Sequence, residues 1–369
     1  MKKVCHLTIP HSRYDERIFL KECRSLSYAG YQVTLLCADN KPEELIDGVK
    51  IKSIPYGRKN KFFRIIGSKK AILKAALCEN ADIYHLHDPE LLPLGLSLKK
   101  AGKKVIYDSH EDVPAQILNK DWIPRYLRKF LAFLFENYEN YICARLDCIV
   151  TVTPHIAHRL SKNNPRTFTI TNFPKIEDHF ININRNPTKR ICFAGGISKQ
   201  WLHENIINAL NDTEGVIYAL AGLAESQQYF AKLENLKNWN RVQYLGYLNK
   251  KEVFSLYSHS AIGIALNEYN ANVGYKLGSI GNTKLFEYML AGIPIICTDF
   301  VLWKEIIEKV NCGICVNPHD IAEIAAAINY LIENPIVAEN MGNNGQNAVF
   351  TKFNWSTQEK ILFELYQSI

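Results

Sequence analysis

The chain has 369 residues, of which 47% are apolar and 22% charged, and its formal net charge is +7. This composition indicates a folded globular chain of two domains rather than a disordered chain. It has no apolar run of about 18 residues, its first residues are too polar for a signal peptide and its ten cysteines stand singly, so we expect no membrane-spanning helix, no disulfide framework and a cytoplasmic location.

The positive charge is concentrated in the first half of the chain. Residues 1–185 contain 30 Lys/Arg and 20 Asp/Glu (net +10), whereas residues 186–369 contain 14 and 17 (net −3). Nine of the cations lie between Asp47 and Glu79, where no acid occurs. The first half is therefore expected to face an anionic partner, which is a nucleic acid, a membrane surface or a phosphorylated substrate.

Two hydrophobic patterns alternate along the first half. Apolar residues at helical spacing predict helices at residues 15–29, 63–79 and 89–101. Short runs rich in apolar and β-branched residues predict strands at residues 2–9, 31–38, 49–55, 81–87, 103–110, 146–153 and 166–172. Strands separated by helices in this way predict a parallel sheet with helices on both faces.

The same alternation starts again after a polar stretch, residues 182–190. Six further strands are predicted at residues 190–195, 215–222, 241–248, 261–267, 293–299 and 312–317, and three closing helices at about 320–334, 335–349 and 355–369. We therefore expect an α/β chain of two doubly wound domains joined near residues 180–188. A ligand is expected at the carboxyl ends of the strands, in a cleft between the domains.

Residues 281–294 contain the strongest local signal for chemistry. Asn282 or Thr283 is a good N-cap, and apolar residues at helical spacing follow until Gly292 ends the helix. The free N–H groups and the positive dipole end of such a helix suit a phosphate. Lys284 adds a full charge there, and the carboxylate of Glu287 can accept hydrogen bonds from two ribose hydroxyls. An ordinary capped amphipathic helix has the same features, and the residues alone leave both interpretations open.

This segment resembles the donor-binding helix of retaining nucleotide-sugar glycosyltransferases of family 4, which have the GT-B fold. Other segments resemble the same family in the expected order: residues 11–39, 82–95, 105–112, 191–196 and 311–366. The resemblance implies two Rossmann-like domains with a central cleft. The acceptor-binding domain would span residues 1–180, with a helix at 355–369 crossing back to it, and the donor-binding domain would span residues 181–354.

The resemblance also implies which residues bind the donor. They are Gly195, Gly196, Lys199, Tyr247, Leu248, Asn282, Thr283, Lys284, Leu285 and Glu287. Ser279 stands where the family has a second glutamate, and the basic pair that usually follows Gly195 is missing. Lys199 and Lys284 are therefore the candidates to balance the leaving diphosphate. The alternative for Lys199 is a surface lysine, and for Tyr247 a core aromatic. No Asp-x-Asp metal pair is present, so we expect a metal-independent enzyme without a cofactor.

On the first domain, His110 matches a histidine that lies close to the donor sugar in relatives and is the predicted catalytic residue. The alternative is a strand-end histidine held by Asp108 or Glu111. The predicted acceptor-side residues are Arg13, Asp15, His87 and Asp88, of which Asp15 could instead cap a helix. Zinc binding by His85, His87 and Asp88 is disfavoured because the sequence shows no third His or Cys ligand.

The implied reaction moves a sugar from a nucleoside diphosphate sugar, UDP favoured over GDP, to a hydroxyl of a saccharide or lipid-linked saccharide in cell-surface polysaccharide biosynthesis. The family uses front-face attack with retention, so no protein nucleophile is expected. Residues 50–74 and 122–135 mix cations with aromatic residues, which predicts peripheral contact with anionic membrane, at the inner face of the plasma membrane. The alternatives are a solvated basic face for the first stretch and a core-packed helix for the second.

Three other functions compete with this reading. The chain could be a nucleotide-sugar epimerase or hydrolase of the same fold, or a non-catalytic partner subunit. It could also be a basic nucleic-acid-binding protein, but its cations match no recognised binding motif, so we expect no nucleic-acid partner.

Overall fold

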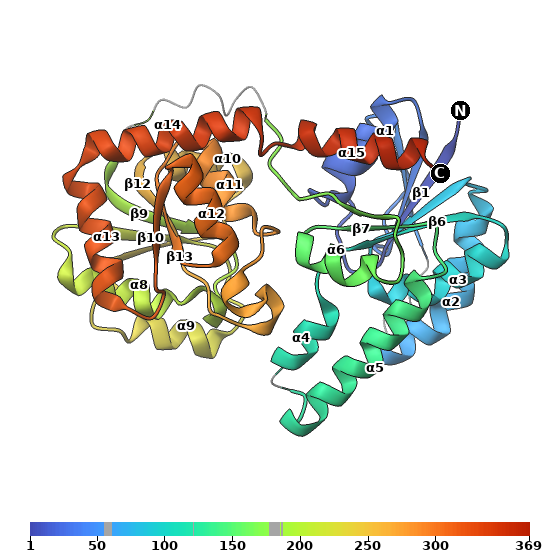
Figure 1. Cartoon of the computed structure of the whole chain (residues 1–369), viewed down its shortest axis with the longest axis horizontal. Coiled ribbons are helices and arrows are strands. Elements are labelled where there is room, and N and C mark those ends of the chain that lie inside the picture. The colour runs from blue at the N-terminus through green and yellow to red at the C-terminus, as the bar shows by residue number, and fades with distance from the viewer. Residues whose placement is uncertain (55–60, 121, 177–184, 186) are drawn as a thin grey trace. The chain divides into compact units, whose positions relative to one another are not determined.

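The structure is a computed structural model that describes residues 1–54, 61–120, 122–176, 185 and 187–369, apart from the side chains of residues 61–69 and 272. The chain forms two compact units (Figure 1). Unit 1 comprises Met1–Asn172 and Ser356–Ile369, and unit 2 comprises Phe173–Trp355. The border between them precedes the join expected near residues 180–188, part of which lies outside the described residues.

Unit 1 is built on an eight-stranded sheet in the order β3-β4-β2-β1-β5-β6-β7-β8. The strands are β1 (Lys3–Thr8), β2 (Gln32–Cys37), β3 (Glu44–Ile46), β4 (Val49–Ser53), β5 (Ile83–Leu86), β6 (Lys104–Ser109), β7 (Cys148–Thr151) and β8 (Thr167–Thr169). All pairs are parallel except β3 with β4. The sequence analysis missed β3, although Asp47 and Gly48, both with positive φ, are a common hairpin turn.

The predicted helices of unit 1 are present with one change, and the helices at residues 113–119 and 154–161 were not predicted. They are α1 (Arg24–Tyr28), α2 (Lys61–Cys78), α3 (Leu92–Lys100), α4 (Val113–Asn119), α5 (Arg125–Cys143), α6 (Pro154–Ser161) and α15 (Trp355–Gln367), preceded in two places by the short turns η1 (Ile18–Cys23) and η2 (Pro89–Leu91). The single helix predicted at residues 15–29 is instead the π-helical turn η1 followed by α1. From Ser356 onward, α15 belongs to unit 1, and Figure 1 shows it beside β1.

Unit 2 contains the six predicted strands in one parallel sheet, in the order β11-β10-β9-β12-β13-β14. The strands are β9 (Thr188–Ala194), β10 (Ile217–Ala221), β11 (Val242–Gly246), β12 (Ser260–Ala265), β13 (Ile295–Thr298) and β14 (Gly313–Val316). The helices are α8 (His203–Ala209), α9 (Gln227–Glu234), α10 (Lys250–Ser258), α11 (Thr283–Leu290), α12 (Val301–Val310), α13 (Ile321–Glu333) and α14 (Pro335–Thr351). The order of the strands reverses between β9 and β12.

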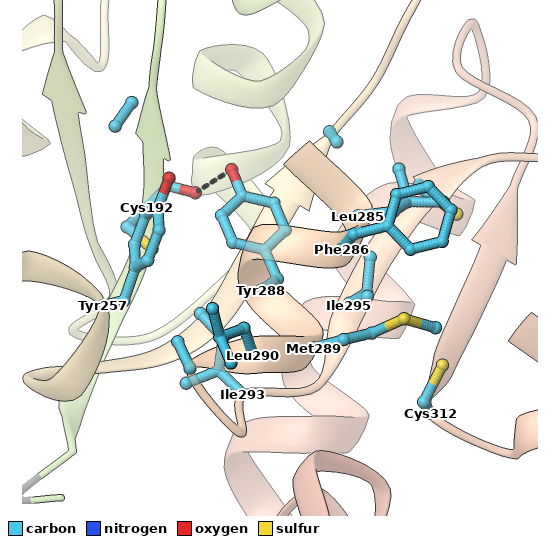
Figure 2. Close-up of a cluster of buried hydrophobic side chains, with 14 of the residues drawn as sticks. Cys192, Tyr257, Leu285, Phe286, Tyr288, Met289, Leu290, Ile293, Ile295 and Cys312 are labelled. Carbon is cyan, nitrogen blue, oxygen red and sulfur yellow. Dashed lines mark hydrogen bonds between the residues drawn. The ribbon is translucent and has the colours of Figure 1, made fainter. Parts of the chain in front are cut away.

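A buried tyrosine fixes α11 on this sheet. The hydroxyl of Tyr288 lies 3.3 Å from the carbonyl oxygen of Cys192 on β9, the contact dashed in Figure 2. It also lies 3.2 Å from the carbonyl oxygen of Ile264 on β12. Gly263 gives the ring its space, because a Cβ there would lie 2.4 Å from the Tyr288 ring. The apolar side chains around the ring in Figure 2 bury the rest of the helix. This packing fixes where α11 begins relative to the strand ends.

Among the described residues, no single helix is long and apolar enough to cross a membrane. One sharply bent pair, Ile321–Glu333 with Pro335–Gln367, meets the length and composition requirement jointly.

Candidate functional site

In unit 2 the strand order reverses between β9 and β12, which is where doubly wound sheets bind ligands at the carboxyl ends of their strands. Gly195 and Gly196 follow β9 there. A Cβ at Gly195 would lie 2.9 Å from Cε of Lys284, and a Cβ at Gly222, after β10, would lie 1.7 Å from the carbonyl oxygen of Gly195. These glycines allow the ends of two strands and the Lys284 side chain to lie in contact.

The start of α11 is capped as the sequence predicts. The side chain of Asn282 accepts a hydrogen bond from the Lys284 N–H at 2.9 Å, and Thr283 is the first helical residue. Tyr288 fixes the helix, as described above, and its positive end therefore has a defined place at the strand ends.

Glu287 is held by three donors on the first turn of α11 and on α10. Thr283 Oγ1 donates at 2.8 Å, Lys284 Nζ at 3.1 Å and the hydroxyl of Tyr257 at 3.1 Å. Burial alone would raise the pKa of Glu287, but the charge of Lys284 and these hydrogen bonds keep the pKa below its usual range. Glu287 is therefore an ionised carboxylate paired with Lys284. The sequence analysis missed Tyr257, which is 30 residues away along the chain.

The other predicted donor residues divide into exposed and buried ones. Lys199 is exposed in the turn after Gly196, and Tyr247 is 71% exposed after β11, so the core-aromatic alternative for Tyr247 is wrong. Leu248 is half-buried against the core. Leu285 is 1% exposed and packs in the core. This corrects the prediction for its side chain, because a helix places consecutive residues on different faces.

Ser279, at the position of the family's second glutamate, lies in a well-fixed loop. Its hydroxyl accepts a hydrogen bond from the Gly281 N–H, and its carbonyl accepts one from the Trp303 indole at 2.8 Å. The side chain of Glu268 accepts hydrogen bonds from its neighbour, the Tyr269 N–H, and from the His319 ring. These two contacts hold the Glu268 carboxylate within unit 2, so Glu268 has a structural role there.

In unit 1 the strand order reverses between β1 and β5, and polar residues meet at the carboxyl ends of these strands. Nε2 of His110 lies 3.1 Å from Oδ2 of Asp108, which also accepts hydrogen bonds from Arg17. Burial alone would raise the pKa of Asp108, but Arg17 and His110 hold it well below its usual value. The alternative for His110, a strand-end histidine held by Asp108, is thus confirmed for the Nε2 atom. The His110 side chain is still 16% exposed.

Two of the predicted acceptor-side residues lie at this edge. Asp15 caps the start of η1 by accepting hydrogen bonds from the Arg17 and Ile18 N–H groups, as its alternative proposed. Asp88 accepts a hydrogen bond from the Ile9 N–H at 2.8 Å. His11, which the sequence analysis missed, lies 3.4 Å from both carboxylates and packs against the His110 ring. Its position directly after the first strand was the available signal.

The other two are inside unit 1. Arg13 is 1% exposed, and its guanidinium forms ion pairs with Asp39 and Glu44 and donates a hydrogen bond to the carbonyl of Pro42. His87 is 1% exposed and lies behind His110, with their ring nitrogens 3.3 Å apart. Both acceptor-side predictions are corrected, because these side chains are directed into the unit and bonded there.

The segment 122–135 carries an exposed apolar face. The five apolar residues singled out in the sequence are between 37% and 78% exposed: Trp122, Leu127, Phe130, Leu131 and Leu134. Tyr126 and Phe133 extend this face. The core-packed alternative is therefore wrong for this segment, and Figure 1 shows α4 and α5 projecting from the body of unit 1. The basic segment 50–74 falls largely outside the described residues, or on side chains that are not described.

Comparison with known proteins covers both units. Residues 16–173 match the family model described as Glycosyltransferase Family 4, and residues 174–348 match the one described as Glycosyl transferases group 1. No curated protein matches the sequence. Among solved structures, similar ones include sucrose-phosphate synthase from Thermosynechococcus elongatus (TM-score 0.76, 15% identity, covering 100% of this chain and 99% of that chain). Others are a glycosyltransferase from Rickettsia africae (0.73, 17%, 100% and 98%) and HepE from Anabaena with UDP and glucose (0.71, 16%, 100% and 100%). At these identities the likeness is one of fold.

Proposed function

Since the chain is a glycosyltransferase with the GT-B fold, we propose that it moves a sugar from UDP-sugar to a hydroxyl of a saccharide or lipid-linked saccharide, with retention, in cell-surface polysaccharide biosynthesis. The observation that carries the proposal is the cluster at the start of α11. There a lysine, an ionised glutamate and a capped helix N-terminus lie beside the glycines that end β9 and β10.

In this proposal the start of α11 binds the diphosphate and Glu287 holds the ribose. Negative charge grows on the leaving diphosphate as the glycosidic bond breaks, and the helix dipole and Lys284 stabilise it there. The bonds from Thr283, Lys284 and Tyr257 orient the Glu287 carboxylate before the donor arrives. UDP is favoured over GDP because HepE, a structural neighbour, was solved with UDP and with UDP-glucose.

We further propose front-face attack without a covalent glycosyl-enzyme and without a catalytic metal. The counter-charge for the diphosphate would come from Lys284 and the helix end, with Lys199 nearby in sequence on the loop after β9. The anomeric configuration of the product, measured by NMR, tests retention. Trapping of a covalent intermediate in a quenched reaction would overturn the mechanism.

The polar edge of unit 1 is proposed to serve the transferred sugar and the acceptor. His110 presents a partly exposed ring whose orientation is fixed by Asp108, and His11, Asp15 and Asp88 surround it. Because the imidazole is already ordered, it can hydrogen-bond a sugar hydroxyl or a phosphate oxygen with little further loss of conformational entropy.

Peripheral membrane contact through the segment 122–135 is also proposed, at the inner face of the plasma membrane. Its exposed aromatic and aliphatic side chains stand beside the exposed cations Arg125 and Lys129, and such a mixture binds anionic lipid surfaces. This location suits a lipid-linked acceptor.

The decisive experiment is isothermal titration of the whole chain with UDP, GDP and ADP, followed by incubation with UDP-sugars. Binding of UDP in preference to the other nucleotides is expected. Failure to bind any nucleotide would favour a non-catalytic partner subunit. Isomerisation or hydrolysis of the donor at full rate without an acceptor would favour the epimerase or hydrolase.

A further inference from the structure

The centre of unit 1 contains four potential metal ligands that sequence analysis did not bring together. Three are histidines, His6 of β1 with His85 and His87 at β5, and the fourth is Glu22 of η1. Each offers a ligand atom within 4.8 Å of the others, and none is more than 1% exposed. We propose that these side chains bind a structural Zn²⁺ ion in the core of unit 1.

The sheet register explains why the histidines converge. His6 lies directly beside His85 in the parallel pair of β1 and β5, so both side chains project from the same face of the sheet. His87 is two residues beyond His85 and shares this face. The sequence analysis considered His85 and His87 as metal ligands but found no third one. The pairing of β1 with β5 places His6 beside them as the third histidine.

The separations of the ligand atoms suit a tetrahedral ion. Zinc bonds of about 2.0–2.1 Å place neighbouring ligand atoms about 3.3 Å apart in a tetrahedron. Nδ1 of His6 lies 2.8 Å from Nε2 of His87, and Oε2 of Glu22 lies 3.9 Å from both Nε2 of His87 and Nδ1 of His85. These distances bracket the required value. A bound ion would replace two hydrogen bonds, the one between Nδ1 of His6 and Nε2 of His87 and the one between Nδ1 of His85 and the Tyr366 hydroxyl.

The far nitrogens of two histidines have polar partners, as the far nitrogens of metal-bound histidines usually do. Nδ1 of His87 lies 3.5 Å from Oδ2 of Asp108, a carboxylate–histidine arrangement. Nε2 of His6 lies 3.3 Å from the Tyr366 hydroxyl on α15. These contacts would fix the rings with one nitrogen directed at the ion.

Glu22 is the strongest sign that the cluster takes a cation. Among the described residues, neither of its buried oxygens accepts a well-aligned hydrogen bond, and its nearest cationic atom is Nε of Arg17 at 3.2 Å. Arg17 also pairs with the buried Asp108, so two carboxylates share one guanidinium. Such burial is costly unless a further positive charge is present. Glu22 lies on a π-helical turn, a conformation common at functional sites.

A shared proton is the competing source of that charge, and metal analysis separates the two. The whole chain is purified without a polyhistidine tag and its metal content is measured by mass spectrometry. We expect about one zinc per chain, lost on dialysis against a chelator and regained on adding Zn²⁺. Re-addition should raise Tm by roughly 5–10 °C at a free zinc concentration a hundred times Kd. Co²⁺ should give the visible absorption bands of a four-coordinate ion.

Substitutions test the ligand set. Glu22→Gln keeps the size of the side chain and is expected to lower zinc affinity by at least tenfold. His203→Gln is the matched control: His203 of unit 2 is equally buried and bonded to a tyrosine hydroxyl at 2.8 Å, as His85 is to Tyr366, and this variant should keep its zinc.

A wild-type chain that carries no metal, shows no Tm shift with Zn²⁺ and gives no Co²⁺ bands would overturn the proposal, and would leave the cluster as a proton-sharing network. UDP affinity, measured in parallel, reports on α11 in unit 2. It distinguishes failure of the zinc proposal from failure of the proposed function.

Discussion

In unit 2 the strands on either side of the reversal bury apolar side chains, such as Phe193 on β9 and Ile264 on β12. In unit 1 the corresponding strands, β1 and β5, bury His6 and His85. Both sheets reverse their strand order at this point and both carry polar residues at the carboxyl ends. Polar chemistry in unit 2 is thus concentrated at a helix start above an apolar core, whereas in unit 1 it continues from the strand ends into the core.

This difference indicates how each unit can fix its functional groups. Unit 2 positions Lys284 and Glu287 through the packing of one helix, by Tyr288 and the glycines near it. Unit 1 positions His110 through a chain of buried hydrogen bonds and ion pairs. Apolar packing tolerates modest change, but a buried polar network is costly when one member is lost.

The largest expected effect tests whether donor binding is confined to unit 2. Replacing Lys284 by Met removes the charge beside Gly195 and leaves the half-buried Glu287 without its cation, and we expect kcat/KM to fall roughly 10²–10³-fold with a matching loss of UDP affinity. Lys304→Met is the control, because Lys304 is an exposed helix lysine paired only with Glu308 among the described residues.

The corresponding change in unit 1 is His110→Asn. It should lower turnover while leaving UDP affinity, measured by titration, within about twofold. Loss of UDP binding in this variant would break the division of roles between the two units.

The next effect concerns the backbone contact between the residues that follow β9 and β10. Gly222→Ala places a Cβ against the carbonyl of Gly195 at a φ of 137°, and we expect unfolding free energy to fall by about 2–4 kcal/mol. Gly215→Ala shares the positive φ but meets no atom closer than 3.9 Å, and should cost only about 1 kcal/mol. Urea denaturation measures both. Equal losses would mean that the close approach contributes nothing.

A smaller effect concerns the buried His203 of unit 2 and how its protonation changes stability with pH. Burial lowers the pKa of His203 to about 3, below the usual value of about 6.5 in the unfolded chain. The folded state therefore binds fewer protons, and the stability due to the neutral ring is present above pH 6.5 and lost as the pH falls toward 3. Relative to His203→Gln, wild type should lose about 1.4 kcal/mol per pH unit between pH 6 and 4.

Urea midpoints at pH 6, 5 and 4 check this slope. The other histidines are common to both proteins, so their contributions cancel in the difference. If the urea midpoints of wild type and of His203→Gln change equally with pH, burial does not hold His203 neutral.

The smallest effect concerns the exposed face of unit 1. Phe130 and Phe133 are 58% and 61% exposed on α5, and changing both to Ser should lower binding to anionic vesicles about tenfold or more, since both rings would lose their contact with lipid. Flotation at low salt measures the effect, and Tyr330→Ser, at an exposed position of unit 2, is the control. Wild type that does not float would exclude the membrane contact.

Much of the fold could be predicted because the hydrophobic periodicity of strands and helices depends on residues that are close together in the sequence. The six strands of unit 2 and the Asn282 cap are where the hydrophobic pattern and the capping residue indicate. Of the cluster at the start of α11, Lys284 and Glu287 were predicted, because they lie within one turn of a single helix. Tyr257, the third donor to Glu287, was not, because α10 approaches α11 only in the folded unit.

In unit 1 the sequence by itself determined seven of the eight strands and the polar residues at their ends, since both depend on neighbours in the chain. Only the tertiary structure decided that Arg13 and His87 are directed inward and that His11 is directed at Asp15 and Asp88. It also decided that His6, His85 and Glu22 meet. The pairing of β1 with β5 and the π-helical turn fix that meeting, and both depend on contacts between residues far apart in the sequence.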